Sequence, residues 1–404
     1  MQIIIYYSSS FVKFFFSLGA GMTLVESLGK LDELDFRVRG RCRYRASEIA
    51  LVTLCALVAG GTSHYDFADY GREKADWLGS LHRLDPRLPD FRNGTPSHDA
   101  FRHFWNNLPP AVLDACFMEW IDWGSIPGAA DEVHVDGKVI RRANAPDGRQ
   151  PCVVSAYSSR DRIVVGHVKT SDKSNEITAI PRLLKKLRLA GAIVTIDAVG
   201  CQTNIVKTIA ERGADYLIAL KGNQGGMLEA AEEIFRDNGA LGWYPRLNGK
   251  FDFAKVAEKG HGRITAWECL HTDDIGGWFG DIGKWAGLKS VCMVATRTKD
   301  TKTGETTEST RYFISSLPAD AKRALGISRR HWDVENPLHW TLDMVFDEDH
   351  SRARGGFSAE NLATMRHFCF DMIRRDKGTH GGMSRRKKAL TWNDRKMLEA
   401  ILAA

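Results

Sequence analysis

Three acidic residues in this chain have positions that suit the binding of a divalent metal ion. Asp136 and Asp197 each end an apolar run typical of a buried strand, in EVHVDG and AIVTID. Glu335 lies in RRHWDVENPLHWTLD, a pattern typical of a helix. Hard cations such as Mg²⁺ prefer oxygen ligands and often bind substrate phosphates together with a few carboxylates. Such a site suits the cutting or joining of a phosphodiester bond.

The three acids are distant in sequence. Asp136 and Asp197 are 61 residues apart (197 − 136), and Asp197 and Glu335 are 138 apart (335 − 197). Because no local loop spans such distances, a folded domain must gather the acids from two strand ends and one helix. At 100° per residue, Glu335 falls on the side of the helix that carries an apolar stripe of three residues. The members of that stripe are Leu338, Leu342 and Phe346. We therefore expect Glu335 to face a core, where a carboxylate needs a cation or dense hydrogen bonding.

The neighbours of Glu335 leave several roles open. His331 and His339 stand four residues before and after it, a spacing that could bind zinc, although the two aspartates favour oxygen-rich coordination. The alternative for both histidines is hydrogen bonding to DNA phosphate or to groups behind the metal ligands. Asp343 competes with Glu335 as the third ligand. The acids at 347–349 fit a solvated turn. Trp332 and Trp340 suit either base stacking or a core.

Basic and amide side chains near the acids are candidates for DNA contacts. On a strand Lys138 points to the same face as Asp136, which fits a phosphate-rich substrate, although an ion pair with Asp136 is the simpler alternative. Three polar residues follow the strand DYLIAL at its carboxyl end. The candidate DNA-binding residues are Lys138, Arg141, Arg142, Lys221, Asn223, Gln224, Arg330, His331 and His339.

Composition is that of a globular protein. A chain of 404 residues favours two domains, and 43% hydrophobic with 26% charged residues is ordinary. The net charge of +6 is uneven, because residues 374–404 carry nine Lys/Arg and three Asp/Glu, including the run at 385–388. This basic cluster fits nucleic acid or a solvated tail. The eight cysteines are scattered, without a CxxC pair, which indicates buried thiols in a reducing cytoplasm.

The pattern changes along the chain define five segments. Residues 1–22 are apolar but lack a good signal-peptide pattern, which favours a spurious N-terminal extension over a weak signal. Residues 23–125 predict an all-helical module, with a helix ended by Gly60 and Gly61 and another capped by Ser97. From Val133 three strands in succession predict an antiparallel meander, and later strand–helix–strand alternation predicts parallel crossovers. We expect a catalytic domain at 130–375 with a mostly β insertion at about 222–315, and a basic tail at 376–404. No segment after the first predicts a membrane span.

The chain resembles the bacterial insertion-sequence DDE transposases of the ISAs type, which include the H-repeat-associated proteins. The matching stretches include HVDGKVIRRA, DKSNEITAIPRLL, IVTIDAVGCQ, YLIALKGNQG, HGRI, RYFISSL and RRHWDVENPLHWTLDMVFDEDHSRAR, and the resemblance covers about Leu31 to Arg375. It implies an α/β fold: an RNase H-like mixed sheet flanked by helices, with a mostly β insertion and a helical, DNA-binding N-terminal module.

The resemblance also implies the chemistry. Asp136, Asp197 and Glu335 would be the catalytic triad and would bind two Mg²⁺ or Mn²⁺ ions, for strand cleavage at transposon ends and transfer into target DNA. The implied partners are double-stranded DNA, in the form of terminal repeats and target, and further copies of the chain in a homodimer or larger assembly. The implied location is the cytoplasm, at the nucleoid, with no membrane. Two positions depart from the pattern: Thr265 follows HGRI where an acid is usual, and Pro337 requires Glu335 to lie in the first turn of its helix.

Three other functions remain open from the sequence. One is a nuclease without strand transfer, and another is a catalytically inactive DNA-binding relic of a mobile element. The third is a carboxylate hydrolase such as a glycosidase, which needs two acids and no metal but leaves the basic C-terminal residues unexplained.

Overall fold

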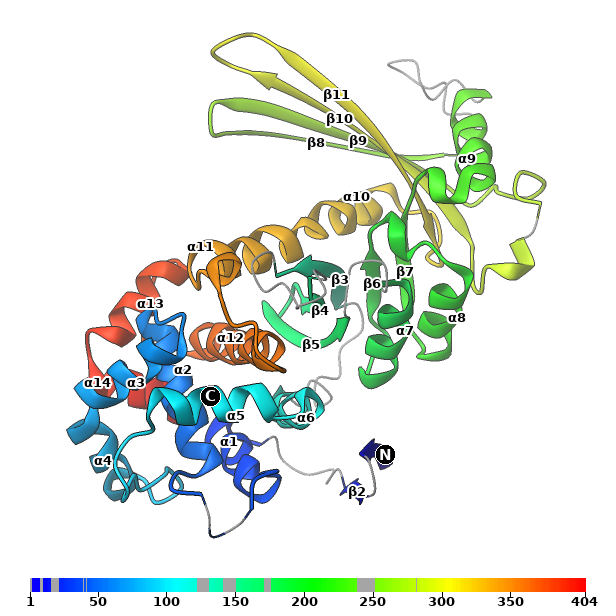
Figure 1. Ribbon diagram of the computed structural model, residues 1–404. Coiled ribbons are helices and arrows are strands. Elements are labelled where there is room, and N and C mark those ends of the chain that lie inside the picture. Colours follow the sequence, from blue (N-terminus) through cyan, green and yellow to red (C-terminus); the bar gives the residue numbers. More distant parts are fainter. Residues whose placement is uncertain are drawn as a thin grey trace. The chain divides into compact units, whose positions relative to one another are not determined.

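The structure is a computed structural model that describes most of the chain in two compact units. The described residues are 2–7, 10–15, 22–38, 40, 42–121, 131–140, 150–170, 176–237, 251–280 and 282–404. One unit comprises Met1–Ser125 and Val345–Ala404, and the other is Ile126–Met344. Figure 1 traces both along the chain. At the N-terminus the backbone forms a small antiparallel pair, β1 (Gln2–Tyr7) and β2 (Ser10–Phe15).

The first unit is otherwise helical. Its helices are α1 (Leu24–Glu33), α2 (Ala46–Ala59), α3 (His64–Glu73), α4 (Ala75–Leu84), α5 (His98–Asn107), α6 (Pro110–Ile121), α12 (Ser358–Arg375), α13 (Met383–Thr391) and α14 (Asp394–Ala403). Helix α2 is buried along nearly its whole length and packs against α1, α3, α12 and α13. It ends at Gly60, whose φ of 102° is a left-handed conformation that glycine adopts without strain. Ser97 caps α5 by accepting a hydrogen bond from the backbone N–H of Ala100. The sequence predictions of this helical module, its glycine stop and its serine cap are confirmed.

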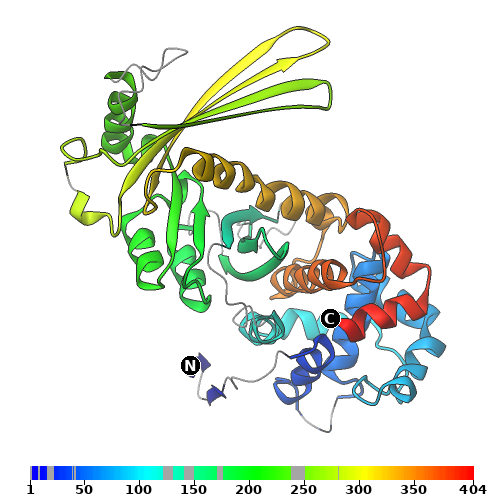
Figure 2. The ribbon, with the colours of Figure 1, turned by 180° about the vertical axis from the view of Figure 1, so that it is seen from behind.

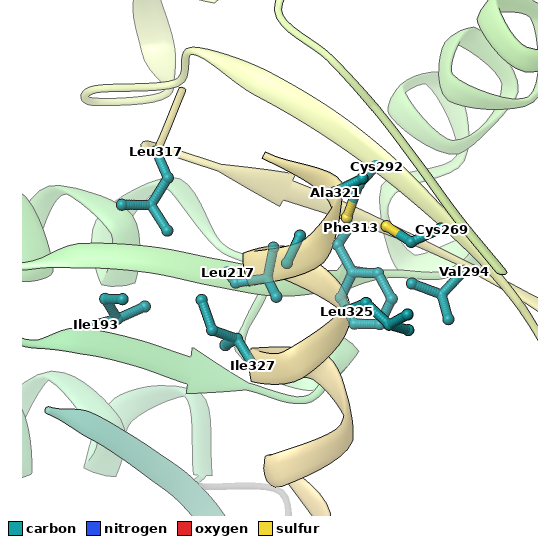
Figure 3. Close-up of a cluster of buried hydrophobic side chains, with 11 residues drawn as sticks. Ile193, Leu217, Cys269, Cys292, Val294, Phe313, Leu317, Ala321, Leu325 and Ile327 are labelled. Atoms are coloured by element: carbon teal, nitrogen blue, oxygen red, sulfur yellow. The ribbon is translucent and has the colours of Figure 1, made fainter. Parts of the chain in front are cut away.

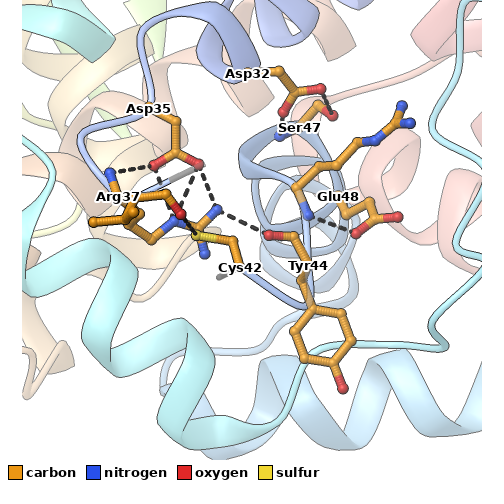
Figure 4. Close-up of polar contacts among 9 residues, drawn as sticks. Asp32, Asp35, Arg37, Cys42, Tyr44, Ser47 and Glu48 are labelled. Atoms are coloured by element: carbon orange, nitrogen blue, oxygen red, sulfur yellow. Dashed lines mark hydrogen bonds and ion pairs between the residues drawn. The ribbon is translucent and has the colours of Figure 1, made fainter. Parts of the chain in front are cut away.

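Polar contacts fasten the connection between α1 and α2. The carboxylate of Asp32 accepts hydrogen bonds from the backbone N–H (2.8 Å) and hydroxyl (2.7 Å) of Ser47. The Arg37 guanidinium binds the carboxylate of Asp35 and donates to the carbonyl of Tyr44 at 2.9 Å, as Figure 4 shows. These bonds satisfy the first turn of α2 and fix the loop before it.

The C-terminal residues differ from the predicted basic tail. Residues 383–403 form α13 and α14, which pack on α2 and α12, and Met397, Ala400 and Ile401 are buried. The indole N–H of Trp120 donates to the carbonyl of Ala404 at 2.7 Å. The charge count drew attention to the cations of this segment, whereas the apolar stripe of α14 is what holds it in the helical unit.

Within the described residues, no single helix is both long enough and apolar enough to cross a membrane. Helices α2 and α3 pass such a test only when they are taken together, and they are bent by 95°.

The second unit is built on a nine-stranded mixed sheet. Its strands are β3 (Glu132–Val139), β4 (Cys152–Ser158), β5 (Ile163–Thr170), β6 (Ile193–Ile196), β7 (Asp215–Leu220), β8 (Asp252–Gly260), β9 (Arg263–Thr272), β10 (Ser290–Asp300) and β11 (Thr306–Ser315). The spatial order is β5-β4-β3-β6-β7-β11-β10-β9-β8. Strands β3, β4 and β5 form an antiparallel meander, and β6 and β7 run parallel to β3. The predicted meander and the predicted parallel crossovers are both confirmed.

Helices link and cover the sheet. They are α7 (Glu176–Lys186), α8 (Thr203–Glu211), α9 (Gly225–Asp237), α10 (Ala321–Arg330) and α11 (Thr341–Met344). Helix α7 packs on β4 and β5 and against α8, whereas α10 packs on β8 and β9. Residues 171–175, which precede α7, lie outside the described residues.

The predicted β insertion extends the sheet instead of forming a separate piece. Strand β11 pairs with β7, so β8–β11 continue the same sheet, and the insertion also contains the helix α9. In Figures 1 and 2 the pairs β8–β9 and β10–β11 extend as long twisted ribbons beyond β3–β7. The first pair turns at His261 and Gly262, both with positive φ. The described part of the predicted insertion thus contains four strands, β8–β11, in agreement with its predicted β character.

A buried cluster fixes α10 on the sheet. Figure 3 shows side chains of α10 packed on β6, β7 and the roots of β9, β10 and β11. The cluster comprises Ile193, Leu217, Cys269, Cys292, Val294, Phe313, Leu317, Ala321, Ala324, Leu325 and Ile327. None of the eight cysteines, all of them among the described residues, forms a disulfide bond; seven are buried as the sequence predicted, whereas Cys42 is partly exposed. Because α10 leads directly into the segment of Glu335, this packing determines which face of the sheet that segment crosses.

Candidate active site

Strand pairing brings the two aspartates together. Strands β3 and β6 are parallel, with His134 opposite Thr195 and Val135 opposite Ile196, so Asp136 lies beside Asp197. Alternation along a strand places His134 and Asp136 on one face, together with Thr195 and Asp197. This is the face that α10 covers, because Ile193 shares it.

Backbone donors orient both aspartates. Asp136 Oδ1 accepts from the N–H of Gly137 at 2.9 Å. Asp197 begins a short 3₁₀ turn, Ala198–Gly200, and its Oδ1 accepts from the N–H of Val199 at 3.1 Å. The turn follows β6 at its carboxyl end, where ligands gather in open α/β sheets.

Glu335 lies on a π-helical turn, Val334–Trp340, instead of on a regular helix. Leu338, Leu342 and Phe346 are buried as predicted, but Glu335 is exposed, so its predicted core-facing orientation was wrong. The 100° wheel fails because a π-helix has a wider turn than an α-helix, and such turns often mark functional sites. Pro337 is accommodated in this turn.

The three carboxylates repel one another pairwise. Burial first, and then the charges of Asp197, Glu335 and Glu176, raise the pKa of Asp136 to about 7, against one backbone hydrogen bond that lowers it. The pKa of Glu335 is also raised, first by partial burial and then by the charge of Asp197, whereas Arg311 and Lys221 lower it. Each acid of the predicted triad therefore lies within electrostatic range of the other two.

The donor chemistry of these acids fits a hard cation. They offer only carboxylate oxygens, and a cation would offset both the burial of Asp136 and the mutual repulsion. The spacing of the acids is less suited to an enclosed metal ion than their donor chemistry is. No group of three or more His, Cys, Asp or Glu side chains in the described part of the chain lies closely enough to enclose a metal ion.

Two side-chain contacts near Asp136 bear on alternatives that the sequence left open, namely the partner of Lys138 and the role of Asp343. Lys138 forms an ion pair with Asp343 at 2.6 Å, where the sequence suggested Asp136 as its partner. Because Asp343 is paired with Lys138, it is a weaker candidate than Glu335 for the third metal ligand. His339 Nδ1 lies 3.4 Å from Asp136 Oδ2, so this histidine is a direct neighbour of the acid.

Other predicted DNA-binding residues have partners within the protein. Asn223 donates to the carbonyl of Ala198 at 2.7 Å, and Gln224 donates to that of Cys201 at 2.9 Å. Both amides thus brace the turn that follows Asp197. Arg330 Nε donates to the Glu132 carboxylate at 2.7 Å.

Of the remaining predicted contacts, Lys221 is exposed, whereas His331 Nδ1 lies 2.7 Å from the hydroxyl of Thr195. Arg141 and Arg142 fall outside the described residues.

The tryptophans and the acids after Glu335 also differ from some expectations. Trp332 and Trp340 are 38% and 57% exposed, which excludes the core role for both. Of the acids at 347–349, Glu348 is buried, so the solvated-turn interpretation was wrong for that residue.

Sequence reasoning missed Arg311 and Glu176. Arg311 comes from β11, lies over the ring of Trp332 at 4.8 Å and lowers the pKa of Glu335. Only the register of the extended sheet places it there, although RYFISSL contains it. Glu176, the first residue of α7, is buried against Gly137, where a Cβ would overlap its carboxylate. A glycine inside a strand was the available signal, because it often marks a close approach.

Comparisons with known proteins give consistent matches over most of the chain. Residues 26–121 match the family described as "DDE_Tnp_1-associated", and residues 129–372 match the one described as "Transposase DDE domain". The chain is 35% identical to the "H repeat-associated putative transposase YhhI" of Escherichia coli K12, over 91% of this chain and 95% of that protein. It is also 35% identical to the "Putative transposase YncI" of Escherichia coli O157:H7, over 92% of each. A solved piggyBac transposase synaptic complex with hairpin DNA aligns over 94% of this chain and 76% of that chain at 11% identity, with a TM-score of 0.39.

Proposed function

Because the chain belongs to the family of transposases with a DDE domain, we propose that it cuts DNA at transposon ends and joins them to target DNA, with Asp136, Asp197 and Glu335 as its catalytic carboxylates. The observation that carries this proposal is the pairwise electrostatic coupling of these three acids, which come from two strands and a helical turn. A structural set of acids would instead be paired with cations one by one.

The sheet supports an RNase H-like catalytic fold. The order β5-β4-β3-β6-β7, with an antiparallel meander and then two strands parallel to the first, is the arrangement expected of that fold. In that arrangement Asp136 is on the first strand and Asp197 follows the fourth, as the family resemblance implies.

The carboxylates would hold two Mg²⁺ or Mn²⁺ ions, which would activate water or a 3′-hydroxyl and stabilise the leaving oxygen. The protein itself contributes orientation and charge. The N–H groups of Gly137 and Val199 hold the two aspartates in position. Arg311 and Lys221 place positive charge beside Glu335, where a phosphate of the DNA backbone would be attracted.

The partners of this reaction are double-stranded transposon ends and target DNA, in the cytoplasm at the nucleoid. Two ends must be processed together, which calls for a dimer or a larger assembly at work. In the helical unit, α13 carries the run at 385–388, of which Arg385 and Lys388 are exposed. These cations are available to the DNA backbone.

The test is a cleavage and strand-joining assay on DNA that carries the repeats flanking the gene. The wild type is expected to cut and join in Mg²⁺ but not in EDTA, and Asp136→Asn to bind the DNA without cutting it. Asp273→Asn, which changes an exposed acid of the same unit, is the matched control and is expected to cut normally. Cleavage by Asp136→Asn at the wild-type rate would refute the assignment. A wild type that binds but never cuts would instead identify an inactive DNA-binding relic.

A further inference from the structure

A chain of hydrogen bonds runs beneath the three carboxylates and connects the elements that carry them. Asp333 Oδ2 lies 2.9 Å from Ser159 Oγ, and Ser159 Oγ lies 2.6 Å from His134 Nε2. His134 Nδ1 lies 2.6 Å from Thr195 Oγ1, which lies 2.7 Å from His331 Nδ1. His134 and Thr195 precede Asp136 and Asp197 by two residues on their strands, whereas Asp333 and His331 precede Glu335.

The carboxylate of Asp333, the first member of the chain, determines the direction of every hydrogen bond in it. An ionised carboxylate only accepts hydrogen bonds, so Ser159 donates its single proton to Asp333. The serine oxygen therefore accepts from His134, which places a proton on His134 Nε2. His134 is fully buried between two neutral hydroxyl groups, where a charged ring would be costly, so it carries that one proton alone.

The same reasoning gives the donor and acceptor of each hydrogen bond at the other end of the chain, at Thr195 and His331. The unprotonated Nδ1 of His134 accepts from the Thr195 hydroxyl, and the Thr195 oxygen, with its proton used, accepts from His331. The proton of His331 is then on Nδ1, and its Nε2 is an acceptor. The two imidazole rings pack edge to face with centroids 5.8 Å apart, which holds both ring planes.

We infer that this chain locks His134 as the Nε2–H tautomer and His331 as the Nδ1–H tautomer, and that Thr195 positions the turn of Glu335 against the two aspartate strands. His331 is thus a positioning residue whose N–H faces Thr195, and it does not donate to a DNA phosphate. The expected effect on cleavage rests on the proposed function, whereas the tautomers do not.

Thr195→Val tests the inference, because valine keeps the shape of the side chain and removes the hydroxyl. Losing a hydrogen-bond partner behind metal ligands typically lowers activity about 10- to 100-fold. We expect a loss of this size in the rate of cleavage, with unchanged DNA affinity in EDTA. Thr195→Ser, which restores the hydroxyl, is expected to restore the rate. Thr208→Val, which removes a buried hydroxyl bonded to Asn204 in α8, is the control and is expected to behave as wild type.

The tautomers are read from the side-chain nitrogen signals of ¹⁵N-histidine-labelled protein, with assignments from single histidine variants. In the wild type the bare-nitrogen signal of His331 is expected at Nε2 and that of His134 at Nδ1. Thr195→Val is expected to abolish the preference of His331 and to leave that of His134, which Ser159 still fixes. A wild-type His331 protonated at Nε2 would overturn the inference. So would a Thr195→Ser protein as impaired as Thr195→Val, or a Thr195→Val protein that matches the wild type. If the wild type cuts no DNA, the proposed function is refuted, and the histidine tautomers alone then test the present inference.

Discussion

Replacing Asp136 with asparagine is expected to stabilise the metal-free protein above neutral pH, although it removes a carboxylate that we propose to be catalytic. Burial, with the charges of Asp197 and Glu335, raises the pKa of Asp136 to about 7 from an ordinary value of 3.8. In the unfolded chain the group ionises near its ordinary value. The wild type therefore loses stability as the pH rises from about 4, and the loss levels off above about 7.

The size of the effect follows from the same difference in pKa. It corresponds to about 4 kcal/mol at full burial. Because 21% of the Asp136 side chain is still exposed, solvent screens part of this cost, and we expect about 2 kcal/mol. Asparagine keeps the Oδ1 atom that accepts from the Gly137 N–H at 2.9 Å, so no backbone contact is lost.

Urea unfolding in EDTA measures this effect. The advantage of Asp136→Asn is expected to be larger at about pH 8.5 than at about pH 5.5, and Asp273→Asn is expected to show none. Saturating Mg²⁺ is expected to stabilise the wild type, by about 2.7 kcal/mol at 100 times the dissociation constant, and the variant much less. A variant that is less stable than the wild type at alkaline pH, or that gains equally from Mg²⁺, would refute the reasoning.

Three further predictions test other parts of the structure. Gly137→Ala is expected to lower the free energy of unfolding by about 1–3 kcal/mol, because the added methyl group overlaps the carboxylate of Glu176; recovery of stability in a Gly137→Ala, Glu176→Ala double variant would confirm the clash. Burial lowers the pKa of His64 to about 4, so the wild type is expected to lose about 2 kcal/mol more than His64→Gln as the pH falls from about 7 to about 4, and parallel thermal melts of the two would contradict this. Arg311→Ala is expected to weaken DNA binding similarly for all sequences and to reduce the salt dependence of the binding constant by about one released ion. An unchanged salt dependence would show that Arg311 does not contact the DNA backbone.

The local pattern of the sequence was enough to predict the strand before Asp197 and a strand at Asp136, but β3 continues to Val139, so the prediction that Asp136 ends its strand was wrong. The apolar run before Asp136 is the first part of β3, and the one before Asp197 is β6. Because β4, β5 and α7 lie between them in the chain, the parallel pairing of β3 with β6 was decided by the fold. The glycine stop of α2 and the serine cap of α5 were equally readable, because capping depends on residues a few positions apart.

Helical periodicity misplaced Glu335. The wheel assumed a uniform α-helix, but Pro337 lies inside a π-helical turn that changes the rotation per residue. The turn leaves the glutamate exposed beside Asp197, Arg311 and Lys221. No window of a few residues contains the information that decides this orientation.

The sequence by itself identified the three acids that we propose for the chemistry and the apolar runs that form the strands of Asp136 and Asp197. Only the tertiary structure decided their partners. Lys138 pairs with Asp343, Arg311 reaches Glu335 from an added strand, and Glu176 fills the space at Gly137. The physical reason is the distance along the chain over which each kind of interaction acts. Strand and helix formation depend on neighbours along the chain, whereas burial, charge repulsion and hydrogen-bond direction depend on residues that meet only after folding.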